Sequence, residues 1–566
     1  MEWQSGEWRN RPRNPPAEGS PLADGRCGRD RRGTPVKPAV SFHPPPRCPL
    51  QSFPTRGRRD LTPGGVGGGP DAAGLLSPAR RVTPTVMPDP RIALHWFRRD
   101  LRLTDNAALH RAVTEAGSVV PVYIVSDWHG RHSWTGPARQ EFLCGSLASL
   151  EKNIKAAGGR LVFRRGRDAP AVLRQLLAET GAGALYFNRE PGEPHGLATD
   201  RAVRALCREL GVACHDEKDA VLHEAGEVLT GGGGPYRVYT PYSRNWNAQP
   251  KPPVRPRVKA FAPLPPALAS LRSDPYPTLA TWGLPSSGVA FPEPGERAAR
   301  DRMHKALSAI LPAYGERRNT PHGQTTSRLS QDLRFGLISI RELHALSLQA
   351  LAAAATATEK QSVQTYINEL AWREFYFALL THYPEVFELE FNPEWRGLPW
   401  SYDTAALTRW QDGQTGFPIV DAGIRELRAT GFMHNRVRMI TAMFLTKDLQ
   451  LDWRLGERFF MQHLVDGESA SNNGGWQWSA GTGADAAPYF RVQNPWSQTK
   501  RYDPDALYIK HWLPELRDVP AALIAQGPAA AGLTTLAKGY PAPMVDHAEE
   551  RDRVLALVNR HRERRR

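Results

Sequence analysis

The chain is predicted to fold as a parallel α/β domain followed by a larger all-helical domain, with a long connector between them. Two observations predict this order. Between residues 91 and 216, short apolar runs of strand length alternate with helical patterns, as in a doubly wound parallel sheet with helices on both faces. After about residue 301, a 3.6-residue apolar period dominates and strand signals fade, which indicates packed helices.

The first 86 residues stand apart from both domains. They contain fifteen prolines and twelve glycines and show no hydrophobic periodicity, so we expect this leader to be disordered. It lacks the apolar run of a signal peptide, and its seven acids are unusual for a transit peptide. We therefore expect translation to start at Met87, with the leader as upstream sequence read in frame.

The α/β domain is expected over residues 87–218. Its strands are predicted at 92–96, 119–125, 160–163, 184–187 and 212–215, and its helices at 106–116, 137–157, 170–181 and 198–210. Such sheets bind ligands near the carboxyl ends of their strands. No GxGxxG motif follows the first strand, so an ordinary dinucleotide site is not predicted here.

The connector is expected over residues 219–300, because this segment is rich in Pro and Gly from residue 231 onward, and the helical domain over 301–566. No apolar run approaches the roughly 20 residues of a membrane span. The five cysteines show no metal-like spacing, which predicts a reduced intracellular protein without disulfides. The leader holds +7 of the net charge of +15, so the other 480 residues are modestly basic and compatible with a polyanion partner.

The run at 464–483, LVDGESASNNGGWQWSAGTG, combines acids, paired amides, a Gly pair and two tryptophans. Buried acids and amides need partners, and Gly-Gly inside a helix costs stability unless something approaches the backbone closely. A polar loop between helices is one interpretation. The other is the wall of a site for a large, flat, polar ligand.

Two further segments carry polar groups at informative positions. TTSRLSQDLR at 325–334 places hydroxyls at the expected start of a helix, as ordinary N-caps or as a cradle for a pyrophosphate. In YINELAWREFYFALL at 366–380, Glu369 lies among apolar residues one turn before Trp372. Pairing with Arg373 at i+4 is the structural alternative for this carboxylate.

Several long motifs occur together and in order: WFRRDLRLTDNAAL, TSRLS, NELAWREFY, GFPIVDAGIRELRATGFMHNRVRM and NNGGWQWSAGTGADAAPYFRVQNP. With them, residues 91 to about 560 resemble the photolyase/cryptochrome flavoproteins, and within that family the class I cyclobutane pyrimidine dimer (CPD) photolyases. The resemblance implies an N-terminal α/β domain and a helical domain that holds FAD.

The resemblance also implies roles for individual residues. Those expected to hold FAD are Tyr314, Thr326, Ser327, Arg328, Leu329, Ser330, Arg438, Asp466, Glu468 and Asn472. Arg438 and Asp466 would form an ion pair against the flavin, and Asn472 would face flavin N5. An amide has no proton to give at neutral pH, which favours a repair enzyme over a plant-type photosensor.

For a pyrimidine dimer flipped out of the duplex, the resemblance implies hydrogen bonds from Glu369 and Asn435 and stacking on Trp372 and Trp478. Burial would favour the protonated form of Glu369. Met439 stands with Asn435 where enzymes for (6-4) photoproducts carry a histidine pair, which argues against (6-4) repair. The phosphates beside the lesion would be bound by Arg318, Arg373, Arg436 and Arg491. Trp476, Trp453 and Trp400 would carry electrons to oxidised FAD.

The implied activity is that of a deoxyribodipyrimidine photo-lyase: excited reduced FAD (FADH⁻) gives an electron to the dimer, two C–C bonds break and the electron returns. We expect a bacterial, cytoplasmic, nucleoid-associated monomer without an obligate protein partner. A second chromophore, folate or deazaflavin, could contact Asn188, Arg189 and Glu190 after a predicted strand. The alternatives are a cryptochrome-type blue-light photoreceptor and a light-independent flavin oxidoreductase.

Overall fold

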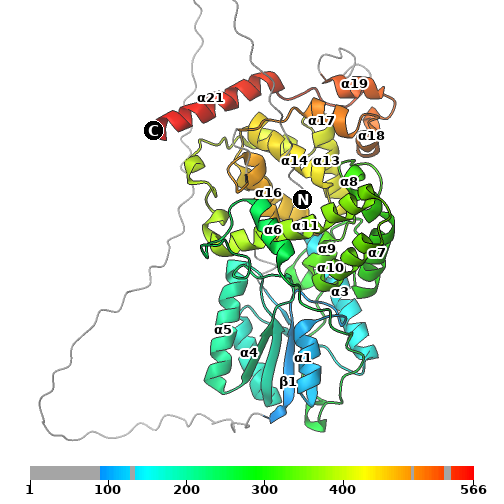
Figure 1. Cartoon of the computed structure of the whole chain (residues 1–566), viewed down its shortest axis with the longest axis vertical. Helices are drawn as coiled ribbons and strands as arrows, with labels where there is room; N and C mark the ends of the chain where they lie inside the picture. The colour runs from blue at the N-terminus through cyan, green and yellow to red at the C-terminus, as the bar shows by residue number, and fades with distance from the viewer. Residues whose placement is uncertain (1–88, 128–133, 486–489, 528–536, 566) are drawn as a thin grey trace, which may run out of the picture. The chain divides into compact units, whose positions relative to one another are not determined.

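Five parallel strands form one sheet in the order β3-β2-β1-β4-β5 (Figure 1). They are β1 (Asp89–Phe97), β2 (Ser118–Val125), β3 (Val162–Arg165), β4 (Ala182–Asn188) and β5 (Ala213–Glu217). The structure is a computed structural model and describes residues 89–127, 134–485, 490–527 and 537–565. The leader and the expected start at Met87 lie outside the described residues.

Helices cover both faces of this sheet, which confirms the predicted fold class. They are α1 (Ala107–Glu115), α3 (Pro137–Ala156), α4 (Ala169–Thr180) and α5 (Pro194–Leu210). Apolar residues of α1 and α3 pack with one set of strand side chains, and those of α4 and α5 with the other set. Each predicted strand and helix is present. Helix α5 begins four residues earlier than predicted, because Pro194 suits the first helical turn.

The strand at β3 begins and ends two residues later than predicted, and it continues through the buried Arg164 to the exposed Arg165. Arg164 is only 5% exposed, and its guanidinium donates to Glu179 at 2.6 Å and to the Arg272 carbonyl. A prediction based on apolar runs ends the strand before a charged residue such as Arg164. A buried arginine with hydrogen-bond partners can nevertheless be part of a strand.

After the sheet domain, the described part of the chain is mainly helical. After α6 (Tyr239–Ala248) come α7 (Glu296–Ala309), α8 (Tyr314–Arg317), α9 (Ser330–Arg334), α10 (Ile340–Ala353), α11 (Ala357–His382), α12 (Thr404–Gln411), α13 (Pro418–Thr430), α14 (Asn435–Met443), the π-helical η6 (Phe444–Asp448), α15 (Trp453–His463), α16 (Ser469–Ala480), α17 (Pro495–Tyr502), α18 (Leu507–Trp512), α19 (Ala521–Gln526) and α21 (His547–Arg565). The 3₁₀ turns are η1 (Pro266–Leu268), η2 (Leu279–Trp282), η3 (Leu311–Ala313), η4 (Pro384–Phe387), η5 (Pro393–Trp395) and η7 (Pro514–Leu516). Among the described residues, no helix is long and apolar enough to cross a membrane.

A buried charge network joins the sheet domain to the helices. The Arg341 guanidinium, at the start of α10, donates to Asp105 at 3.1 Å and to Asp219 at 2.7 Å, and Arg102 donates to Asp219 at 2.8 Å. Burial opposes the charge on Asp219, but the two guanidinium groups lower the pKa of this carboxyl to about 2. Because these groups are almost inaccessible to solvent, removing one partner would leave a buried charge.

The connector is partly helical. Helix α6 packs against α11, and the ring of Tyr239 stacks on that of Trp372 with centroids 3.6 Å apart. The connector therefore supplies part of the helical core.

Candidate active site: a cavity among the helices

The α8, α9, α11, α14 and α16 helices surround a cavity, here called the helical cavity, that holds about 1370 Å³ of space free of protein atoms, its open mouth included. All ten residues predicted to hold a flavin line it. So do five residues expected at the lesion, the DNA and the electron path: Glu369, Arg373, Asn435, Met439 and Trp476. Motifs from distant parts of the chain therefore meet at one site.

The run at 464–483 forms one wall of this cavity as helix α16, so the interpretation as a polar loop is wrong for most of it. Close packing requires the first glycine of the Gly pair, because a Cβ at Gly474 would lie 2.1 Å from ring atoms of Tyr376. The adjacent asparagines anchor the helix: Nδ2 of Asn472 donates to the Glu457 carbonyl at 3.1 Å, and Nδ2 of Asn473 to the Glu457 carboxylate at 2.9 Å.

Glu457 itself is fully buried on α15. Burial raises the pKa of its carboxyl to about 8, although the hydrogen bond from Asn473 opposes this shift. Its second oxygen, Oε2, has no hydrogen-bond partner among the described residues. A neutral carboxylic acid thus lies directly behind Asn472 at neutral pH.

A carboxylate of the run at 464–483 is held by two donors. Asp466 Oδ2 accepts from Arg438 at 2.9 Å and from the Ser330 hydroxyl at 2.6 Å. Its Oδ1 is buried and has no partner among the described residues. An unsatisfied buried acceptor in a cavity wall is costly unless a ligand donates to it.

The TSRLS segment forms the entry to α9. Helix α9 begins at Ser330, and no side chain caps it, so the interpretation of these hydroxyls as ordinary N-caps is wrong. Arg328 has φ 49°, a left-handed conformation that is uncommon outside glycine, and its guanidinium lies 4.0 Å from the centre of the Phe432 ring. Such strain is typical of backbone shaped for a ligand.

Glu369 pairs with a different arginine than the alternative interpretation expects. Nη1 of Arg318 donates to its Oε1 at 2.7 Å, and both side chains are more than nine-tenths buried. Arg373 instead donates to the Ala220 carbonyl at 2.7 Å and lies 3.9 Å from Glu468. Glu369 therefore accepts a charge-assisted hydrogen bond from an arginine outside its own helix. The apolar surroundings of Glu369 in the sequence do not predict this partner.

Arg318, which pairs with Glu369, belongs to a group of neighbouring arginines: Arg436 lies near Arg318, and Arg491 and Arg501 lie near Arg436. Burial and the neighbouring Arg436 lower the pKa of Arg318 to about 10. Burial and then the charges of Arg501 and Arg491 lower the pKa of Arg436, against the effect of Tyr502. Clustered cations that lower one another's pKa form a site that favours anions.

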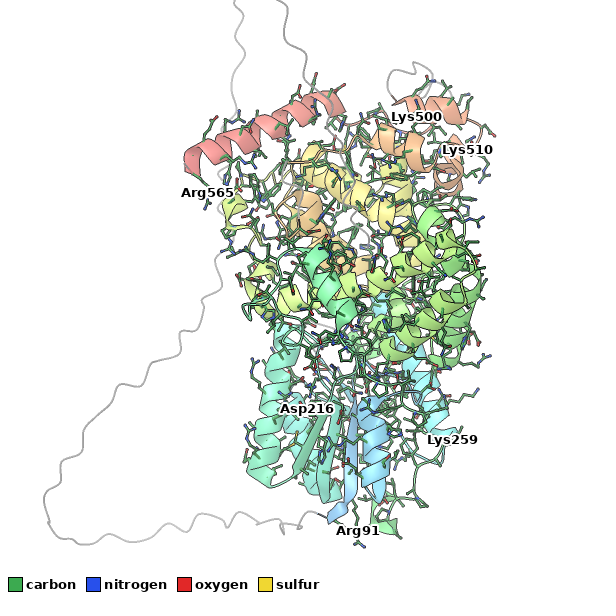
Figure 2. All side chains as sticks on the ribbon, viewed as in Figure 1. Arg91, Asp216, Lys259, Lys500, Lys510 and Arg565 are labelled. Atoms are coloured by element: carbon green, nitrogen blue, oxygen red, sulfur yellow. The ribbon has the colours of Figure 1, made fainter. Side chains whose placement is uncertain are left out.

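Arg501 was not predicted, because a single lysine-flanked arginine late in the chain has no motif of its own. The basic side chains continue outward on α17 and α18, where Figure 2 labels Lys500 and Lys510. Arg373 faces a different group of charges from the other predicted arginines, since it lines the helical cavity and its charged neighbours include Glu468, Arg99 and Arg334.

The two tryptophans predicted to stack on bases lie behind the cavity wall. Trp372 is 1% exposed and has Tyr239 against one face. Trp478 is 7% exposed, packs with Met439 and Met443, and donates to the Asp485 carbonyl at 3.2 Å. Trp478 thus adjoins the cavity through Met439, whereas Trp372 belongs to the core formed with α6.

Of the three remaining tryptophans, Trp476 lines the cavity, whereas Trp453 and Trp400 lie outside its lining. Nε1 of Trp476 has no acceptor among the described residues. Its ring packs so closely on Gly456 of α15 that a Cβ there would lie 2.1 Å from it. Trp453 begins the same helix and is fully buried, and Trp400 is half-buried.

Glu468 lines the helical cavity but is engaged with the sheet domain. Its carboxylate accepts from Arg99, which follows β1. Burial opposes its ionisation, yet Arg99, Arg334 and Arg373 hold the pKa of Glu468 below its ordinary value. This residue therefore connects the cavity wall to the end of the sheet.

A second cavity, the sheet-edge cavity, opens at the carboxyl ends of the strands and holds about 2430 Å³ free of protein atoms. Arg98, Arg167 and Glu190 line it from the sheet domain, and Arg454 and Glu457 from α15.

Of the three residues proposed for a second chromophore, Glu190 alone lies in this wall. The Asn188 amide donates to Asp100 at 2.6 Å and to Asn106 at 2.8 Å, and Arg189 donates to Glu224 at 2.8 Å. Both side chains are thus engaged in internal hydrogen bonds, and their contact with a chromophore stays a prediction.

Comparisons with known proteins agree with this geometry. The family model described as "DNA photolyase" matches residues 93–262, and the "FAD binding domain of DNA photolyase" matches 366–560. A deoxyribodipyrimidine photo-lyase of Synechococcus sp. is 41% identical over 82% of this chain and 96% of its own. A class III photolyase structure from Agrobacterium tumefaciens is 36% identical, with a TM-score of 0.76 over 86% of this chain and all of its own. An archaeal photolyase structure from Sulfolobus tokodaii, described with two FAD molecules, is 30% identical, with a TM-score of 0.71 over 83% of this chain and all of its own. The chain belongs to the photolyase/cryptochrome family and carries that family's FAD-binding domain.

Proposed function

We propose that this protein is a deoxyribodipyrimidine photo-lyase that repairs cyclobutane pyrimidine dimers in DNA. The observation that carries the proposal is a shared location: the expected flavin residues, Glu369, Asn435 and Met439 line one cavity, and a cluster of arginines lies beside Glu369. We also propose that it acts as a monomer on nucleoid DNA in the bacterial cytoplasm.

The helical cavity suits FAD. The buried Oδ1 of Asp466 and the buried Nε1 of Trp476 each lack a partner among the described residues, so they can accept from and donate to a polar ligand. Thr326, Ser327 and Ser330 offer hydroxyls beside the strained backbone of Arg328 for the phosphates and ribityl chain. When bound and reduced, FAD supplies a light-driven electron and receives it back, so the net reaction is redox-neutral.

The protein's own residues bind and orient the lesion. Glu369 and Asn435 would hydrogen-bond the flipped bases, and Arg318 would have to release Glu369 when a base replaces it. The arginine cluster would bind flanking phosphates, which makes association salt-dependent. Of the two predicted stacking residues, Trp478 is the better placed, because Trp372 already stacks on Tyr239.

Asn472 supports repair over plant-type photosensing. Its Nδ2 is used by the Glu457 carbonyl, which leaves Oδ1 as an acceptor on the cavity side. An acceptor suits a reduced flavin that carries hydrogen at N5, and an amide cannot supply a proton to that atom.

We further propose that the sheet-edge cavity holds a second chromophore that transfers excitation to FAD. Its volume and its position at the carboxyl ends of parallel strands suit a planar cofactor, folate or deazaflavin. Absorption spectra of the native protein, before and after addition of each pigment, would identify it; no added band with any pigment contradicts this part.

The activity is tested with reduced, FAD-loaded protein and an oligonucleotide that contains one thymine dimer, under near-UV or blue light and in the dark. We expect light-dependent recovery of thymines. Glu369→Gln should lower the repair yield while FAD stays bound. A protein that binds FAD and shows no repair when reduced would instead be a photoreceptor of the cryptochrome type.

A further inference from the structure

Two of the three tryptophans in the proposed electron path share one carboxylate oxygen. Nε1 of Trp400 and Nε1 of Trp453 each lie 3.3 Å from Oε1 of Glu390. Glu390 is only 3% exposed and lies between η4 and η5. No motif of the sequence singles it out, and the chain brings it to Trp453 across 63 residues.

The same carboxylate is paired with a cation that touches only one of these tryptophans. Nη2 of Arg454 lies 3.2 Å from Oε1 of Glu390, and its guanidinium carbon is 4.6 Å from the centre of the Trp453 ring. Over the part of the chain that the structure describes, no cation lies over the Trp400 ring in the same way.

The contacts of Glu390 and Arg454 make the two indoles differ in how easily each is oxidised. An oxidised indole is positively charged and its N–H becomes far more acidic. The Glu390 carboxylate stabilises that charge on either ring, and it does so strongly because it is buried. Arg454, over the face of Trp453, opposes the charge there. Trp400 is therefore the easier of the two to oxidise.

We propose that Glu390 is the proton acceptor of the tryptophan path. Glu390 and Arg454 together favour the oxidised state of Trp400 over that of Trp453. The proposal rests on the proposed role of the three tryptophans in reducing oxidised FAD. Trp476 gives one electron to photoexcited FAD, Trp453 refills Trp476, and Trp400 refills Trp453. The Nε1–H proton of Trp400 passes to Oε1 of Glu390, which leaves a neutral indole radical and a neutral carboxylic acid.

The cycle closes with a one-electron reductant of the thiol class. It returns one electron to Trp400, the proton returns from Glu390 to Nε1, and the oxidised thiol releases its own proton to solvent. Glu390 is unchanged at the end. Since repair itself starts from reduced FAD, Glu390 has no part in that reaction.

The test is transient absorption of the FAD-loaded, oxidised protein. Glu390→Gln keeps an acceptor oxygen and the size of the side chain but removes the charge. We expect conversion of the tryptophan cation radical to the neutral radical to slow by about tenfold or more. Glu390→Asp should restore part of the rate. Glu385→Gln, at an exposed carboxylate of the same segment, is the matched control and should convert like the parent.

Two further measurements keep the result interpretable. In the unsubstituted protein, the conversion rate should not depend on the concentration of buffer base, because the acceptor is internal; dependence on buffer would overturn the proposal even if Glu390→Gln failed to fold. An unchanged conversion rate in a folded Glu390→Gln would also overturn it.

The Trp400→Phe variant tests the electron path separately from the role of Glu390. If Trp400→Phe leaves photoreduction of FAD unchanged, the path is wrong and the proposal fails with it. If Trp400→Phe slows photoreduction and Glu390→Gln does not alter the radical, only the role of Glu390 is refuted. Dimer repair by the chemically reduced Glu390→Gln protein should equal that of the parent, whereas loss of repair would show that Glu390 supports the active site instead.

Discussion

The helical cavity takes its walls from short motifs of one domain, whereas the sheet-edge cavity is assembled from loops of the sheet domain and helices far along the chain. In the first, the charged groups Arg438, Asp466, Glu369 and Arg318 are paired. In the second, arginines and carboxylates from both domains face one space. The contrast teaches that the charges of the helical cavity pair within one domain, whereas Arg99 of the sheet-edge cavity pairs with Glu468 across the two domains.

Glu457 lines the sheet-edge cavity and accepts from Asn472 of the helical cavity, and its substitution gives the largest expected effect. Its folded pKa of about 8 lies above its unfolded value of 4.5, so the stability due to its neutral form is complete below pH 4.5 and is lost as pH rises toward 8. Glu457→Gln lacks this loss and keeps an acceptor for Asn473. Relative to the parent, its free energy of unfolding should rise by about 4 kcal/mol from pH 4.5 to pH 8.

Urea unfolding at several pH values measures this difference. A constant offset between the two proteins across the range would show that Glu457 is ionised in the folded state. Glu385→Gln, at an exposed carboxylate, should show no such trend.

Gly474→Ala should damage the helical cavity alone. The new methyl group would meet the buried Tyr376 ring at 2.1 Å, so α16 must shift, at a cost of about 3 kcal/mol. We expect loss of FAD with any second chromophore retained, measured by absorption of the purified protein. Ser471→Ala, in the same helix and cavity wall, is the control. Normal FAD content in Gly474→Ala would mean that the wall adapts easily.

The Arg318–Glu369 pair tests whether the charges of the helical cavity depend on each other. Arg318→Gln leaves a buried carboxylate without its cation and should lower stability by about 2 kcal/mol. The double variant with Glu369→Gln should recover most of that loss. Additive effects in a double-mutant cycle, measured by urea unfolding, would show that the pair is not coupled in solution.

The smallest expected effect is on the salt dependence of DNA binding, which should change with Arg501 and not with Arg167. Arg501→Ala should weaken binding to undamaged and damaged DNA alike and reduce the slope of log affinity against log salt by about 1. Arg167→Ala, an exposed arginine of the sheet-edge cavity, should leave the slope unchanged. Equal changes in both variants would place DNA across both regions.

Much of the fold and of the helical cavity could be predicted from sequence because the information is local. Short apolar runs report each strand, and contiguous motifs such as TSRLS supply neighbouring wall residues. What escaped prediction depends on contacts across long separations. Arg318 meets Glu369 across 51 residues, and Tyr239 meets Trp372 from a segment predicted only as a Pro- and Gly-rich connector. Asn188 follows an apolar run like any ligand residue, and only the fold shows that Asp100 and Asn106 use its amide.

The ion pair between Arg99 and Glu468 has a thermodynamic consequence for ligand binding. Arg99 lines the sheet-edge cavity and Glu468 lines the helical cavity, so one charge contact belongs to two binding equilibria. A chromophore that draws Arg99 away would change the charge that Glu468 presents to FAD. By linkage, whatever factor the chromophore contributes to FAD affinity, FAD must contribute to chromophore affinity. The pigment that gathers light would then also be a regulator of flavin retention.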